Sequence, residues 1–122
     1  MPRVVHFELA ADDPERASKF YSDVFGWKIR KWDGPEDYWL ATTGEPGQLG
    51  IDGGIMRRNA DMPAVVNTID VASVDDSVAR IEAGGGKVVA PKMAIPGIGY
   101  LAYCLDTEGN MFGVMQSDPS AA

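Results

Sequence analysis

Hydrophobic and polar positions follow one plan along the first half of the chain and repeat it along the second. Residues 3–10 alternate as in a strand with one buried face, and the apolar positions that follow recur at helical spacing. Three shorter strand-like segments, separated by glycine- and proline-rich turns, come after that helix. The strands predicted in the first half cover residues 3–10, 27–32, 38–42 and 49–56. Those predicted in the second half cover residues 64–71, 87–90, 99–105 and 111–116, with a loop over residues 91–97.

Each half also carries one helix with recognisable start and stop signals. Asp13 is a typical capping residue, Pro14 suits the first helical turn, and Gly26 ends the helix. In the second half, Ser73 caps a helix that ends at the glycine run 84–86. The order in each half is strand, helix and three strands. The pattern therefore predicts two tandem βαβββ modules.

The two modules align when the sequence is shifted against itself by 60 residues. His6 then lies over Val66, and an offset of 59 near the module ends places Gly54 over Gly113. Identities are few, so the repeat rests on the apolar pattern and the glycine positions. The paired residues are expected to occupy equivalent places in the two modules.

The repeat also predicts the domain organisation. We expect a single domain over residues 1–118. Its first module covers residues 3–56, a polar linker covers 57–63, and its second module covers 64–116. Residues 119–122 are expected to form a frayed tail.

Composition narrows the classes of partner. The 122-residue chain has a formal net charge of −7, which argues against nucleic acid and against an anionic membrane surface. No apolar run approaches the roughly 20 residues of a membrane span, and the start has no signal-peptide core. The one cysteine, Cys104, cannot form an internal disulfide. These features predict a cytoplasmic protein.

Four segments resemble the vicinal oxygen chelate superfamily, which holds glyoxalases, bleomycin-resistance proteins and extradiol dioxygenases. The segments are His6–Leu9, Asp13–Ala17, Phe20–Trp27 and Asp106–Gly113. The resemblance covers nearly the whole chain. It implies an α+β fold in which two βαβββ modules, related by pseudo-twofold symmetry, form curled mixed sheets around a cleft. It also implies a homodimer.

The resemblance further implies where a metal ion would bind. Metal enzymes of the superfamily take ligands from the first and last strands of each module, and the matching positions are His6, Gly54, Val66 and Gly113. Only His6 has a donor side chain, and it is the only histidine in the chain. A catalytic divalent ion usually needs about three protein ligands. We therefore expect no metal ligands and no cofactor, with a divalent metal only as the alternative.

Strand alternation then predicts which side chains face the cleft that the family implies. His6 and Glu8 lie on one strand face and are the candidates for acid–base catalysis. Glu8 is expected to raise the pKa of His6. The residues expected to contact a ligand are His6, Glu8, Asp52, Gly54, Thr68, Tyr100, Gly113 and Met115.

Purely structural roles also remain open for the same residues. His6 also fits an ordinary strand histidine bonded to a neighbour, and Asp52 fits the cap of a turn. Gly54 and Gly113 fit packing positions where strands approach closely, while Met115 fits core filler.

Three functions follow from the sequence. The first is a small-molecule binder that holds its ligand in a dimer cleft without a metal ion. The second is a glyoxalase-like lyase or isomerase, or a dioxygenase-like enzyme, either metal-free or using Glu8 or Asp52 as unorthodox ligands. The third is a non-catalytic interaction subunit that kept the fold and lost the site. The missing ligands favour the first function.

Overall fold

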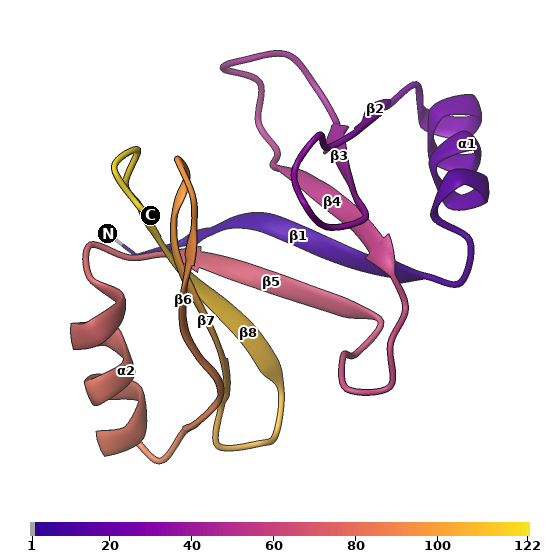
Figure 1. Ribbon diagram of the computed structural model, residues 1–122. Helices are drawn as coiled ribbons and strands as arrows, with labels where there is room; N and C mark the ends of the chain where they lie inside the picture. The colour runs from indigo at the N-terminus through magenta and orange to yellow at the C-terminus, as the bar shows by residue number, and fades with distance from the viewer. Residues whose placement is uncertain (1) are drawn as a thin grey trace. The chain divides into compact units, whose positions relative to one another are not determined.

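The computed structural model describes residues 2–122 and contains the predicted order of elements (Figure 1). Two βαβββ modules follow one another in an α+β fold. The elements of the first are β1 (Val4–Ala11), α1 (Pro14–Phe25), β2 (Lys28–Lys31), β3 (Tyr38–Thr42) and β4 (Asp52–Arg57). Those of the second are β5 (Val65–Asp70), α2 (Val74–Ala83), β6 (Lys87–Ile95), β7 (Gly99–Leu105) and β8 (Met111–Ser117).

The chain forms two compact units. The first unit contains residues 6–66, and the second contains residues 67–122 with the start of β1 up to Val5. In the first unit the strand order is β2-β3-β4-β1, with β1 and β4 parallel and the other pairs antiparallel. In the second unit the order is β5-β8-β7-β6, with β5 and β8 parallel.

The registers of the two parallel pairs agree with the sequence repeat. Glu8 lies opposite Gly54 in the β1–β4 pair, and Thr68 lies opposite Gly113 in the β5–β8 pair. The shift that places His6 over Val66 also places Glu8 over Thr68. The two modules therefore pair their first and last strands in the same way.

The first unit is held together by an aromatic cluster between its helix and its sheet. Asp13 caps α1 by accepting a hydrogen bond from the Arg16 backbone N–H, and Gly26 ends the helix with a positive φ of 75°. Tyr21 on α1 stacks on Trp27 at a centroid distance of 4.7 Å, and Phe7 of β1 lies 5.7 Å from the same indole ring. Tyr21 and Trp27 of the resemblance segment are half-buried in this cluster, whereas Phe20, Val24 and Phe25 are exposed.

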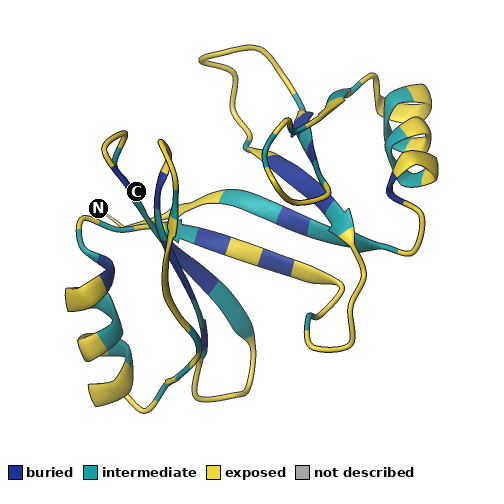
Figure 2. Ribbon diagram, viewed as in Figure 1, coloured by how far each residue is buried: buried dark blue, intermediate teal, exposed yellow. Residues whose placement is uncertain are grey.

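The second unit packs α2 against β6, β7 and β8. Val74, Ala102 and Val114 form its buried centre, and β5 shows the alternation of buried and exposed positions expected of a strand (Figure 2). Ser73 caps the helix through the Asp76 backbone N–H. The Val74 backbone N–H donates to Gln116 Oε1 at 3.0 Å, which ties the helix start to β8.

Two segments of the second unit differ from the expectation. β6 continues through Pro91 to Ile95, where the sequence predicts a loop. β6 is the outer strand of its sheet, and the ladder is irregular between Ala90 and Met93, so the missing N–H of proline is tolerated there. The chain end, predicted to fray, is tied down because Ala121 is buried and its carbonyl accepts a hydrogen bond from Gly97 N–H.

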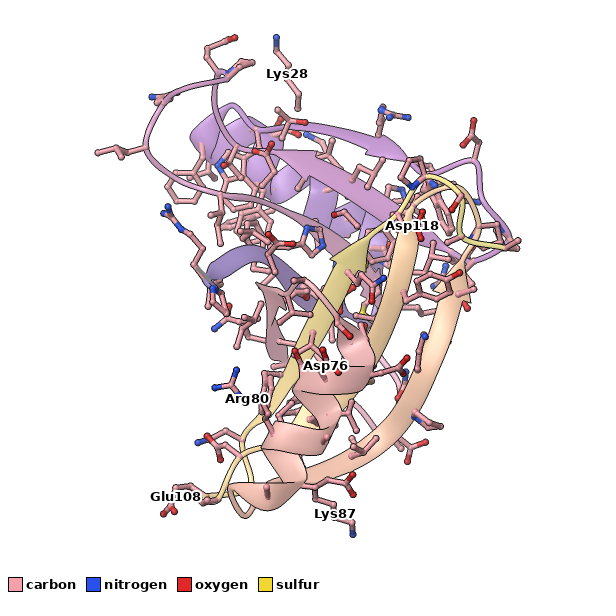
Figure 3. All side chains as sticks on the ribbon, turned by 90° about the vertical axis from the view of Figure 1, so that its left-hand side faces the viewer. Lys28, Asp76, Arg80, Lys87, Glu108 and Asp118 are labelled. Atoms are coloured by element: carbon pink, nitrogen blue, oxygen red, sulfur yellow. The ribbon has the colours of Figure 1, made fainter. Side chains whose placement is uncertain are left out.

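Several charged side chains lie on the outside of the elements. Figure 3 shows Arg80 on α2 and Glu108 on the β7–β8 turn pointing away from the ribbon, and both residues are exposed. Among residues 2–122 there is no helix whose length and apolar content suit a membrane crossing.

Candidate functional site

One face of the first unit gathers four of the residues that the sequence singles out. The parallel register places His6 opposite Asp52 and Glu8 opposite Gly54. Residues opposite one another in a ladder share a face, and so do alternate residues of one strand. The face shared by His6 and Glu8 therefore also carries Asp52 and Gly54. Glu8 is 8% exposed, so the carboxylate belongs to the interior of this face.

Tyr38, at the start of β3, completes the group. Its hydroxyl lies 2.7 Å from His6 Nε2, and the phenol and imidazole rings are nearly parallel at 14°. A Cβ built on Gly54 would overlap the oxygen and ring carbons of this phenol. The space left by the missing side chain at position 54 is thus filled by Tyr38.

The glycine next to it has the same effect on the opposite face of the sheet. A Cβ on Gly53 would overlap the Phe7 ring, which belongs to the aromatic cluster under α1. The Gly53-Gly54 pair therefore lets one aromatic ring lie close to β4 on each side. Side chains at these two positions would force both rings to move.

Burial, rather than charge, decides the protonation of His6. Desolvation lowers the pKa of His6 below its ordinary value, and the smaller effects of Glu8 and then Asp52 raise it. The expectation that Glu8 leaves the pKa of His6 raised is therefore wrong, although the carboxylate acts in the expected direction. The lowered pKa favours the neutral imidazole at pH 7, in which one ring nitrogen can accept a hydrogen bond and the other can donate one.

Asp52 has a structural partner as well as its place beside His6. Its Oδ1 accepts hydrogen bonds from the Thr43 backbone N–H at 2.8 Å and from Thr43 Oγ1 at 3.3 Å. Asp52 is exposed, and the two bonds close the base of the 43–51 loop between β3 and β4. This is the turn-capping role that the sequence left open.

The same loop encloses a hollow of its own. A cavity of about 350 Å³ is lined by Thr42–Gly50 and Asp52. His6 and Tyr38 do not line it. Its lining combines three glycines and a proline with polar side chains, among them Glu45 and Gln48.

The second unit has a smaller version of the same arrangement. Thr68 is buried, and a Cβ on Gly113 would lie 3.2 Å from Thr68 Oγ1 and 3.4 Å from Leu101 Cδ1. Met115 lies opposite Leu101 in the β7–β8 ladder and shares this face. Tyr103, opposite Gly113, belongs to the same group, and its ring would lie 3.5 Å from this Cβ.

Tyr100 is separated from those residues. It lies opposite Gln116, while Gly113 lies opposite Tyr103, so alternation puts Tyr100 on the other face of the sheet. There it packs against the Val74–Ala102–Val114 centre, with Lys92 Nζ 4.7 Å above its ring. The structure therefore gives Tyr100 a packing role in the second unit.

The residues of the first unit do not fit a divalent metal ion. His6 Nε2 is engaged by Tyr38, and the volume of a ligand side chain at position 54 is taken by the phenol ring. Among residues 2–122 no group of three or more His, Cys, Asp or Glu side chains is placed to hold a metal ion.

Tyr38 was missed by reasoning from the sequence. Trp32 packs edge-on to the Tyr38 ring, with centroids 6.4 Å apart and planes at 80°. Tyr38 and Leu40 lie on the same face of β3, and Leu40 lies opposite Gly54. The sequence signal for Tyr38 was its position two residues before Leu40, the residue paired with Gly54. That signal could be used only if the pairing of β3 with β4 was already known.

Sequence comparison identifies relatives of this chain. Residues 3–44 match the family described as "Bleomycin resistance protein-like N-terminal". A glyoxylase-like domain-containing protein of Didymella fabae is 33% identical over 116 residues, which make up 88% of each chain. The CFP32 protein of Mycobacterium bovis is 30% identical over 115 residues, and this chain spans 44% of that relative.

Solved structures share the fold at low identity. A methylmalonyl-CoA epimerase of Streptomyces coelicolor has a TM-score of 0.72 at 15% identity. The alignment covers 98% of this chain and 97% of the epimerase chain. A glyoxalase/bleomycin resistance protein/dioxygenase superfamily member from Vibrio splendidus has a TM-score of 0.65 at 19% identity, covering 97% and 100%. Matches at such low identity show a common fold only, so the function has to be inferred from the residues of the site.

Proposed function

This chain belongs to the glyoxalase/bleomycin resistance/dioxygenase superfamily, and from that premise we propose that it binds a small organic molecule without a metal ion. The observation that carries the proposal is the hydrogen bond between Tyr38 and His6 at 2.7 Å, made in the space that Gly54 leaves open. The family resemblance implies a metal-ligand side chain at position 54, and the phenol–imidazole pair beside Gly54 supports binding without one.

The chemistry around this pair suits an organic ligand with a ring and polar groups. Trp32, Tyr38 and His6 supply flat aromatic surfaces, while Glu8 and Asp52 supply negative charge on the same face. Aromatic walls with a few fixed polar groups are typical of small-molecule sites. The carboxylates on this face also favour a ligand that carries hydrogen-bond donors, because hydrogen bonds to a charged acceptor are the stronger ones.

The proposed assembly is a homodimer, as the family resemblance implies. Its subunit number and any retained ligand can be measured together by native mass spectrometry of protein purified from cells. We expect a dimer that retains a small organic molecule and less than one equivalent of metal.

His6 is the residue whose replacement tests the binding role. His6→Ala should weaken retention of the molecule by about tenfold or more, since an unpaired buried polar group costs about 1–3 kcal/mol. Lys87→Ala, on the exposed start of β6, is the matched control and should retain the molecule as the wild type does. Stoichiometric metal that survives a chelator wash, or equal retention by His6→Ala, would contradict the proposal.

A second candidate is a metal-free enzyme, and the same hydrogen bond favours it. A neutral imidazole beside a phenol is placed to move a proton between two side chains. If the retained molecule is chemically altered on incubation with wild-type protein but unchanged with Tyr38→Phe, the enzyme is favoured over the binder.

A further inference from the structure

We propose that the space between Gly54 and His6 is a binding cradle for a phenolic ring, which Tyr38 fills in the free protein and which a phenol-class ligand takes over. This inference rests on the proposed function and names its ligand class. It concerns residues of the first unit alone.

The cradle has a defined floor and a defined polar end. The floor is the backbone of Gly54, where even a Cβ would overlap the phenol. The polar end is His6 Nε2, at hydrogen-bond distance from the hydroxyl. A ring that reaches this position must therefore be flat and must carry a hydroxyl at its far end.

One wall of the cradle is aromatic. Trp32 meets the Tyr38 ring edge-on with centroids 6.4 Å apart, which is a favourable geometry for a pair of aromatic rings. The imidazole of His6, nearly parallel to the phenol, lies end-on to it at the hydroxyl and forms only the polar end. Leu40, opposite Gly54, adds an apolar neighbour on the same strand as Tyr38.

Tyr38 is attached in a way that allows its ring to leave. It is the first residue of β3 and follows the exposed turn 33–37, and its own side chain is only half-buried. The backbone there is fixed, because the Trp32 N–H donates to the Tyr38 carbonyl at 2.7 Å. Rotation about the Cα–Cβ bond moves the ring out while the strand stays paired. A ligand phenol then remakes the bond to His6 that Tyr38 gives up.

The test uses phenol as the probe and the imidazole NMR signals of His6 as the readout, since His6 is the only histidine. In Tyr38→Ala, phenol should bind saturably and shift the His6 signals, as small aromatic molecules do in cavities cut by removing a side chain. Toluene lacks the hydroxyl and should bind at least about tenfold more weakly. Adding Gly54→Val to Tyr38→Ala refills the cradle and should abolish the shift.

The matched control opens a comparable space without an imidazole. Tyr103→Ala removes a ring that lies 3.5 Å from a Cβ built on Gly113, in the second unit. With this variant, phenol should move the His6 signals no more than it does in the wild type.

Wild-type protein provides the test of displacement, and it does not depend on the folding of a variant. Phenol should shift the His6 signals saturably, with an affinity at least about tenfold below that of Tyr38→Ala because Tyr38 must first leave. No saturable shift up to the solubility limit of phenol overturns displacement. An equal response to toluene and phenol overturns the hydroxyl contact.

The outcomes separate this inference from the proposed function. If phenol fails while cell-purified protein keeps another molecule in a His6-dependent way, the ligand class is wrong and the binding function stands. If phenol binds but His6→Ala changes no retained molecule, the cradle exists and the proposed function is wrong.

Discussion

The hydroxyl of Tyr38 and Nε2 of His6 are joined by a 2.7 Å hydrogen bond between residues 32 positions apart in the chain. Gly54 makes the contact possible, because any side chain there would occupy the place of the phenol. The pair thus places an aromatic hydroxyl beside the imidazole in the space over Gly54.

Tyr38→Phe is expected to lower the free energy of unfolding by about 1 kcal/mol, the usual net contribution of one hydrogen bond. Urea denaturation followed by circular dichroism measures this change. Tyr21→Phe is the control, since the Tyr21 ring stacks on Trp27 at 4.7 Å and keeps that contact without its hydroxyl. Equal losses in the two variants would show that the bond to His6 contributes nothing specific.

Gly54→Ala is expected to cost about 1–3 kcal/mol of unfolding free energy, because the added methyl group overlaps the Tyr38 phenol and the site has to rearrange. Gly113→Ala, at the equivalent position, should cost less, since its nearest neighbour would be 3.2 Å away. Denaturation of both single variants measures the difference.

The same steric argument predicts energetic coupling. Once Tyr38 is replaced by Ala, the phenol is gone and Gly54→Ala should cost little. A double-mutant cycle on these two positions isolates the interaction. Additive losses, with no coupling between positions 38 and 54, would contradict the structural account of the cradle.

The fold could be predicted from the sequence because local signals agree with one another. The strands at residues 38–42 and 99–105 have the predicted bounds, since each lies between clear turn residues. The Asp13 and Ser73 caps also form as predicted. β6 was predicted too short because Pro91 signals a break, and only the position of β6 at the edge of its sheet permits that proline.

The candidate site could be predicted only in part. Alternation along β1 correctly places His6 and Glu8 on one face, and the repeat correctly pairs Gly54 with Gly113. Tyr38 was missed because its approach to His6 depends on strand pairing across three strands. The direction of the His6 pKa shift was wrong because desolvation, which needs the folded structure, exceeds the attraction of Glu8.

The pKa of His6 predicts a pH dependence of stability. Burial lowers the pKa of His6 below the ordinary value of 6.5, so the unfolded chain takes up this proton at a higher pH than the folded chain does. The free energy of unfolding should therefore fall as the pH falls from 6.5 through the folded pKa. Urea denaturation across this range should show a steeper decline for the wild type than for His6→Gln. Parallel profiles would contradict the prediction.

The two carboxylates beside His6 should differ in their effect on its pKa. Glu8 raises the pKa of His6 more than Asp52 does, although both effects are smaller than that of burial. Glu8 is buried on the face of His6, whereas Asp52 is exposed and also bonded to Thr43. Screening by water weakens the interaction of an exposed charge more than that of a buried one.

Glu8→Gln should therefore lower the pKa of His6 further than Asp52→Asn, and both variants should titrate below the wild type. An NMR titration of the imidazole signals measures all three values without overlap from another histidine. Asp37→Asn is the control, because Asp37 forms exposed ion pairs with Lys31 and Arg57 and is absent from the groups that shift His6. A larger shift of the His6 pKa in Asp52→Asn than in Glu8→Gln would contradict this ranking. The main negative charge beside His6 would then be that of Asp52, next to the 43–51 loop, and not that of Glu8.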